Sequence, residues 1–150
     1  MMKSKRFEPI REIASTSAKD LSRAMGEAAR KVADLERQFE QLQSYRDEYV
    51  RNSQSPAAID AVKLQNYRSF LDRLGEALRL HLKNLDTARA EYERRRALWS
   101  EKRIEAESLS RVVDRFRMEE RHAADRREQH EGDEAAMRMS LAAAIGTGNH

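Results

Sequence analysis

Hydrophobic residues recur along most of the chain in alternating steps of four and three positions. A first run is apolar at every such position except Arg46: Ala14, Ala18, Leu21, Met25, Ala28, Val32, Leu35, Phe39, Leu42, Arg46 and Tyr49. A second run with the same spacing is apolar except at His81, Arg95 and Lys102: Leu64, Tyr67, Leu71, Leu74, Leu78, His81, Leu85, Ala88, Tyr92, Arg95, Trp99, Lys102, Ala106, Leu109, Val113 and Phe116. A 3.5-residue repeat held this long is typical of a coiled-coil seam. The pattern predicts two long helices that pair along one stripe.

Two prolines and one polar cluster divide these runs. Pro9 and Pro56 each fit the first turn of a helix, where the missing N–H donor is not needed. The cluster Asn52-Ser53-Gln54-Ser55 favours a turn, and Ser55 is a suitable N-cap for a helix that begins at Pro56. We therefore predict a helix over 9–51, a tight turn over 52–55, a second helix over 56–131, and a flexible tail over 132–150.

So short a turn makes the two helices antiparallel and predicts an all-α, two-stranded coiled-coil hairpin over residues 1–131. Pairing about this turn matches positions whose numbers sum to about 108, which places Phe39 near Ser69 and Phe70 and Leu21 near Thr87. The second helix then overhangs the first from Lys102 onward. An apolar stripe without intramolecular cover is expected on this overhang and suggests a missing partner, at Ala106, Leu109, Val113 and Phe116.

Composition agrees with a chain of few, long helices. Of the 150 residues, 37% are charged and 39% are hydrophobic, with only five glycines and two prolines. This leaves too little apolar material for a thick globular core, while a net charge of +3 argues against simple disorder. The absence of cysteine excludes disulfides and thiol chemistry and indicates a reducing compartment such as the cytosol. We expect neither a membrane span nor a secretory signal.

The sequence shows no pattern typical of catalysis or metal binding. His81, His122, His130 and His150 lack the spacing of a His-Glu-x-x-His site, and no glycine-rich loop precedes a Lys-Ser or Lys-Thr pair. His81 lies in the seam, where a polar residue more often sets the register than binds a ligand. A two-stranded rod also offers no concave substrate pocket. We predict a protein that is not an enzyme, with no cofactor, no metal and no small-molecule substrate.

One face near the turn carries aromatic residues outside the seam. The repeat places Leu42, Tyr49, Leu74 and His81 at d positions and Gln38, Tyr45, Phe70 and Ala77 at g positions. Because the g edges of an antiparallel pair lie on the same side, Tyr45 and Phe70 are expected to share a face. Clustered aromatic residues of this kind favour a docking patch. The alternative is that they only cover the edge of the seam.

Two sequence blocks resemble a known family. The blocks Tyr45-Arg46-Asp47-Glu48-Tyr49 and Asn66-Tyr67-Arg68-Ser69-Phe70-Leu71, together with Arg127-Glu128-Gln129 and Asp133-Glu134, are similar to the flagellar FliJ family. The last block departs from the family pattern at His130 and Gly132, where lysine is usual. The resemblance covers nearly the whole chain and implies a non-enzymatic, cytoplasmic coiled coil of the flagellar type III export apparatus. It also implies a location at the inner membrane at the flagellar base, and a role in motility.

The resemblance further implies three partners. They are the hexameric flagellar export ATPase, which the coiled coil enters as a stalk, the export gate membrane protein, and substrate-specific export chaperones. The gate contact of the family carries onto Gln38, Leu42, Tyr45, Tyr49, Phe70, Leu74, Ala77 and His81. No comparable motif marks the ATPase contact, which we expect at the end away from the turn.

Charge leaves other interpretations open. Residues 1–31 contain eight basic and four acidic residues, and such a basic end suits an acidic protein surface or anionic lipid headgroups. The chain lacks an uncompensated basic stripe interleaved with aromatic residues, so no nucleic acid is expected as a partner. The alternatives are the stalk of a virulence-type III secretion system, a nucleic-acid-binding coiled coil, and a scaffold whose overhangs pair between molecules.

Overall fold

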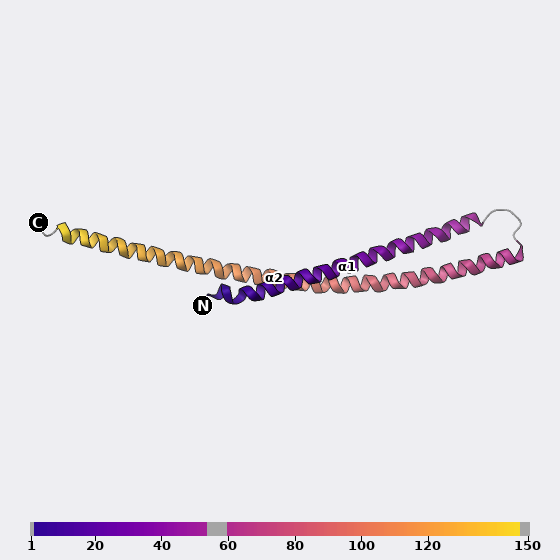
Figure 1. Cartoon of the computed structure of the whole chain (residues 1–150), viewed down its shortest axis with the longest axis horizontal. Coiled ribbons are helices and arrows are strands. Elements are labelled where there is room, and N and C mark those ends of the chain that lie inside the picture. The colour runs from indigo at the N-terminus through magenta and orange to yellow at the C-terminus, as the bar shows by residue number, and fades with distance from the viewer. Residues whose placement is uncertain (1, 54–59, 148–150) are drawn as a thin grey trace. The chain divides into compact units, whose positions relative to one another are not determined.

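The computed structural model describes residues 2–53 and 60–147, which form two helices and no strand (Figure 1). Helix α1 spans Lys3–Asn52 and helix α2 spans Ala61–Thr147. The chain divides into a hairpin unit, Ser17–Lys102, and a terminal unit, Met1–Thr16 with Arg103–His150. Each unit contains part of both helices. The predicted all-α fold of two long helices packed against each other is confirmed.

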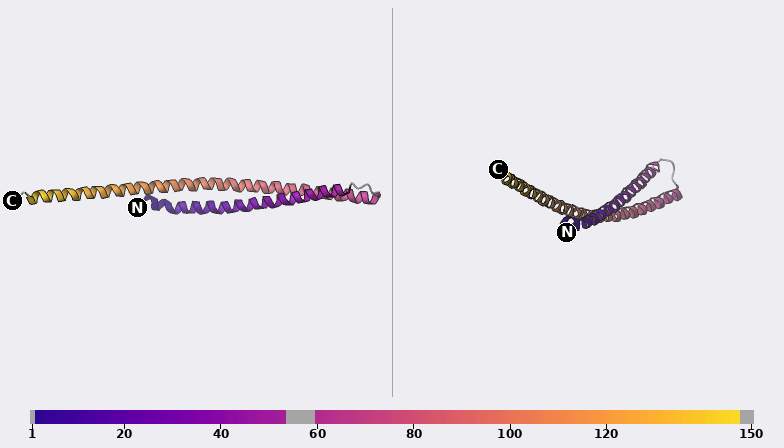
Figure 2. Two further views of the ribbon diagram at one scale, coloured as in Figure 1. Left: turned by 90° about the horizontal axis from the view of Figure 1, so that it is seen from above. Right: turned by 60° about the vertical axis from the view of Figure 1, so that its left-hand side comes forward.

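Contacts in the hairpin unit show that α1 and α2 run antiparallel. Going backward along α1, Tyr49 stacks on Tyr67, Glu36 pairs with Arg89, and the Ala24 carbonyl accepts a hydrogen bond from Arg95. As the residue numbers in α1 fall, the residue numbers of their partners in α2 therefore rise. Figures 1 and 2 show these purple and pink parts of the ribbon side by side. The buried core of this unit consists of Ala28, Leu74, Leu78, Leu85 and Ala88.

The hydrophobic repeat correctly predicts which face of each helix is covered. Every predicted seam position in α1, from Ala14 to Tyr49, is buried or half-buried. The same holds along α2 from Tyr67 to Phe116, and only Leu64 at the start of the run is exposed. Even the polar seam residues follow the rule, because His81 and Arg95 are half-buried. The 3.5-residue period therefore identifies the packed stripe of both helices.

The predicted register between the helices is wrong. Phe70, expected near Phe39, contacts Tyr45 and Tyr49 instead. Ser4 bonds to Glu120, although the predicted pairing left α2 without a partner beyond Lys102. These pairings lie at higher residue numbers in α2 than predicted, because a heptad repeat looks the same after a shift of one heptad and does not fix the register.

The terminal unit corrects the expectation of an uncovered stripe on α2. Val113 has no exposed surface, and Phe116 packs against Phe7 with ring centroids 5.4 Å apart. Phe7 belongs to the start of α1, which was predicted to begin only at Pro9. An overhang of α2 exists, but it begins later than predicted, since residues 124–146 are exposed throughout.

The start of α1 and the end of α2 differ from the prediction, whereas α1 ends at Asn52, within one residue of its predicted end. Pro9 lies inside α1 and not in its first turn. At the other end, α2 continues to Thr147 through residues expected to form a flexible tail from Gly132. Alanine, methionine and leucine dominate residues 135–144 and are strong helix formers, which accounts for this continuation. The proposed N-cap Ser55 and the helix start at Pro56 lie outside the described residues.

Asp60 caps the observed start of α2. Its side-chain Oδ1 accepts a hydrogen bond of 2.7 Å from the backbone N–H of Lys63, and its carbonyl accepts one of 3.0 Å from Leu64. A side-chain acceptor at this position satisfies an N–H group that has no partner within the helix.

In the described part of the chain, neither helix is long and apolar enough to cross a membrane.

Candidate interaction surface

Four aromatic side chains meet near the loop end of the hairpin unit. Tyr49 of α1 contributes to two contacts: it stacks on Tyr67 at 5.4 Å between ring centroids and tilts against Phe70 at 4.5 Å. Tyr45, one turn earlier, meets Phe70 edge to face at 6.3 Å. These geometries are favourable for aromatic rings, whose positive edges attract negative faces. The cluster therefore fixes α1 and α2 to each other at this end.

The cluster also presents an aromatic side chain to the exterior. Tyr45 keeps 52% of its surface exposed, whereas Tyr49, Tyr67 and Phe70 are half-buried. Phe70 thus covers the seam, as one interpretation of the sequence held, while Tyr45 stands mostly outside it. Beside Tyr45, a shallow hollow on α1 is lined by Arg37, Glu40, Gln41, Ser44 and Glu48. An aromatic ring bordered by charged groups is an arrangement that suits protein contacts.

The eight residues predicted for the gate contact have different degrees of burial. The structure brings Tyr45, Tyr49 and Phe70 into contact. Gln38 is exposed, and Leu74 is buried in the core at 8% exposure. The others are half-buried: Leu42, Ala77 and His81. Leu74 can therefore act on a partner mainly by supporting its neighbours, and the accessible part of the set centres on Gln38 and Tyr45.

His81 is the polar exception within this face. Its Nδ1 atom is buried and has no hydrogen-bond partner within the described residues. A buried polar atom in a coiled-coil seam reduces stability but can select one register over others.

No group of three or more His, Cys, Asp or Glu side chains in residues 2–53 and 60–147 is placed to hold a metal ion.

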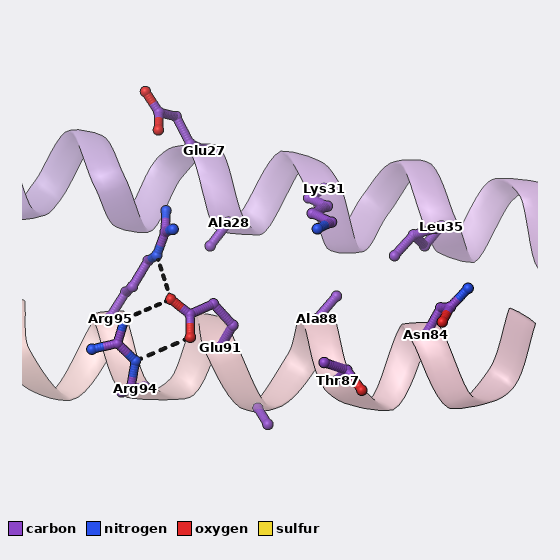
Figure 3. Close-up of a pocket in the computed structure, with 11 residues that line it drawn as sticks. Glu27, Ala28, Lys31, Leu35, Asn84, Thr87, Ala88, Glu91, Arg94 and Arg95 are labelled. Carbon is purple, nitrogen blue, oxygen red and sulfur yellow. Dashed lines mark hydrogen bonds and ion pairs between the residues drawn. The ribbon is translucent and has the colours of Figure 1, made fainter.

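A groove between the helices lies farther along the hairpin unit, where the seam residues are small. Figure 3 shows Ala28 of α1 and Ala88 of α2 on its two sides, with Leu35 and Lys31 along its α1 wall. Small side chains leave space between the two backbones that larger residues would fill. Charged side chains border this space, so the groove has no continuous apolar lining.

Glu91, at the end of this groove, holds two arginines of its own helix. Its carboxylate accepts hydrogen bonds from Arg94 at 2.7 and 3.0 Å and from Arg95 at 2.9 Å (Figure 3). The bond from Arg94, followed by that from Arg95, lowers the pKa of Glu91 from 4.5 to about 2. Arg95 also donates to the Ala24 carbonyl of α1 at 2.9 Å, so this cluster ties the two helices together.

Two residues important for this unit are not identified by the sequence pattern. Asp60 is an acceptable N-cap by residue type, but the cluster of polar residues at 52–55 gave a stronger turn signal. Tyr67 falls on the predicted seam and was not assigned to the interaction face. The stack of Tyr49 on Tyr67 depends on the register between the helices, which a repeating pattern does not specify.

Comparisons with known proteins identify the family of this chain. The model of the family described as Flagellar FliJ protein matches residues 2–144. A Flagellar FliJ protein from Escherichia coli (strain K12) is 25% identical over 134 residues, which cover 88% of this chain and 91% of that relative. No solved structure matches. Because the family match extends from the start of α1 nearly to the end of α2, the chain belongs to the flagellar FliJ protein family.

Proposed function

We propose that this protein is the non-enzymatic stalk of the flagellar type III export apparatus. Membership of the flagellar FliJ family makes the chain a component of flagellar export. The finer role has three parts: it links and stimulates the hexameric export ATPase, contacts the export gate membrane protein, and escorts substrate-specific chaperones. Such a protein acts in the cytoplasm, peripherally at the inner membrane at the flagellar base.

The aromatic cluster of the hairpin unit is the observation that carries the gate contact. Tyr45 is half-exposed and is held by Phe70, so its ring is available to a partner while its position is restricted. Restriction before binding reduces the conformational entropy lost on association. Gln38 adds an exposed polar group about two turns earlier on the same edge of α1. These features support the gate contact implied by the family.

The terminal unit supports a contact with the export ATPase. Residues 124–146 of α2 form a helix that is exposed along its length. This segment ends in large apolar side chains that are all exposed: Met137, Met139, Leu141 and Ile145. An exposed apolar helix end suits insertion into a protein partner. The basic excess of residues 1–31 adds attraction to an acidic surface.

The proposed mechanism is mechanical and allosteric. With 87 residues, α2 has a contour length of about 130 Å, which allows separate contacts at different parts of the helix. A stalk that binds the subunits of a ring unequally shifts their conformational equilibria and so promotes turnover. The same stalk, bound to the gate through the hairpin unit, couples that cycle to export.

Truncations of the two chain ends test this function with purified proteins. We measure ATP hydrolysis by the flagellar export ATPase in the presence of the full chain, a variant without residues 1–12, and a variant without residues 135–150. Each truncation should lower stimulation, because each removes part of the terminal unit. The second truncation keeps every contact described between α1 and α2, so it separates loss of binding from loss of folding. Full stimulation by both variants contradicts the proposed ATPase contact.

A further inference from the structure

The start of α1 is fastened to α2 by few apolar contacts. Within residues 3–14, Phe7 packs on Phe116 and Ala14 is buried. The other large apolar side chains of this segment face outward, with Ile13 at 70% exposure and Ile10 nearly half exposed. Segments with little buried apolar surface open locally at low free-energy cost. The attachment of this segment therefore depends strongly on polar contacts.

Polar contacts join this segment to α2 at several positions. Glu120 of α2 accepts two hydrogen bonds from Ser4, one from the backbone N–H at 3.0 Å and one from Oγ at 2.6 Å. Glu8 pairs with Arg117 of α2. Arg11 approaches Asp114 of α2, with 3.8 Å between Nη1 and Oδ1. The Ser4–Glu120 contact lies at the very end of α1, where helices begin to fray.

Glu120 acts as an N-cap supplied by the neighbouring helix. The first turn of α1 contains no acidic residue, so the carboxylate of Glu120 provides the negative charge that helix N-termini favour. The hydrogen bonds from Ser4 lower the pKa of Glu120, with smaller contributions from the Lys3 backbone N–H and the Arg117 charge. Ser4 itself is buried. The two bonds to a charged acceptor are thus stronger than ordinary surface contacts.

Pro9 weakens the helix between this cap and the rest of α1. A proline inside a helix has no N–H group and so removes the backbone hydrogen bond to the carbonyl four residues earlier, here that of Lys5. The first residues of α1 are therefore tied less firmly to the remainder of the helix. Loss of the cap at Ser4 then allows fraying to proceed toward Arg11.

We propose that residues 3–14 of α1 form a strap that opens locally from α2, with Glu120 as the latch that keeps it closed. Opening uncovers the apolar stripe of α2 that includes Val113 and Phe116. This stripe adjoins the exposed helix over residues 124–146 within the same unit. The opening does not depend on the proposed function.

Thiol labelling measures the opening without any partner, so its outcome is independent of the proposed function. The natural chain has no cysteine, and a single introduced thiol is therefore the sole reactive site. Val113→Cys places it under the strap at a position with no exposed surface, and Leu85→Cys places it in the hairpin unit at 2% exposure. Because both sites are buried, labelling reports on opening. We expect faster labelling at position 113 than at position 85.

The latch is tested by combining each probe with Glu120→Gln, Ser4→Ala or the control Glu119→Gln, which alters an exposed neighbour. Glu120→Gln removes the charge that strengthens these hydrogen bonds, and the free energy of opening should fall accordingly. Labelling at position 113 should therefore be about tenfold faster or more. The labelling rate at position 85, and the rate at position 113 in the Glu119→Gln control, should stay within about twofold of those of the single-cysteine parents. An equal increase at both positions means that the chain opens globally and overturns the strap. If labelling at position 113 does not become faster, or becomes equally fast with Glu119→Gln, the role of Glu120 as the latch is rejected.

Discussion

Tyr45 and Phe70 meet edge to face across α1 and α2, with ring centroids 6.3 Å apart, although Tyr45 remains half-exposed. Phe70 is also in contact with Tyr49, so one ring both covers the seam and supports the exposed tyrosine. A partner that binds Tyr45 therefore meets a ring whose position the hairpin already restricts. Loss of Phe70 therefore affects both the fold and the support of Tyr45, so a test of binding must also measure folding.

Tyr45→Ala combined with Phe70→Ala should abolish tight binding to the export gate. Aromatic anchors at protein interfaces contribute about 2 kcal/mol or more each, so the loss of even one anchor should lower affinity at least about 30-fold. The lost ring contacts should cost the fold only about 0.5–1.5 kcal/mol each. Gate affinity is measured by calorimetry, and helicity by circular dichroism.

Two arginine variants serve as controls for that experiment. Arg51→Ala and Arg73→Ala remove exposed side chains that do not belong to the predicted gate face. Both should bind the gate as the natural chain does, and the aromatic double variant should still stimulate the ATPase. Normal gate binding by the double variant shows that the rings serve only the seam and rejects the gate surface.

Leu78→Asp should strongly destabilise the hairpin unit. Leu78 is buried in the seam, and an unpaired charge there costs several kcal/mol. Leu35→Asp should act in the same direction but less, because Leu35 is half-buried beside the groove. The matched control is Leu80→Asp, at an exposed position two residues away. Urea unfolding followed by circular dichroism ranks the three, and equal midpoints for Leu78→Asp and Leu80→Asp argue against the observed seam.

Asp60→Ala should lower the free energy of unfolding by about 1 kcal/mol, since it removes the side-chain acceptor for the Lys63 N–H. Asp60→Ser retains an acceptor suited to the same position and should recover most of the loss. Hydrogen exchange at the first amides of α2 locates the effect. Unchanged exchange there in Asp60→Ala would place the functional start of α2 elsewhere.

Acid should remove a stabilising contribution from Glu91. Its folded-state pKa of about 2 lies below its ordinary value of 4.5, so the ionised carboxylate favours the folded state. The contribution is complete above pH 4.5 and is lost as the pH falls from 4.5 through about 2. Thermal melting of Glu91→Gln should accordingly fall less over this interval than that of the natural chain. Glu101→Gln, at an exposed position, is the comparison, and 1 M salt should reduce the difference.

The sequence by itself determined the fold class and the inward faces of both helices. The spacing of apolar residues is a local property, and a helix converts it directly into a stripe. The shared face of Tyr45 and Phe70 follows from the same repeat, because their positions relative to the seam need no knowledge of the partner helix. This is why the predicted seam agrees with the structure, whereas the contact between these two rings depends on the register.

Only the tertiary structure decided which residues of the two helices face each other. A repeat of seven looks the same after a shift of one heptad, so periodicity cannot select the register. Selection comes from the start of α2, which Asp60 caps, and from cross-helix contacts such as Tyr49 with Tyr67 and Ser4 with Glu120. The same contacts decide that the N-terminal segment lies against α2, because the carboxylate of Glu120 caps α1 at Ser4, 116 positions away in the chain.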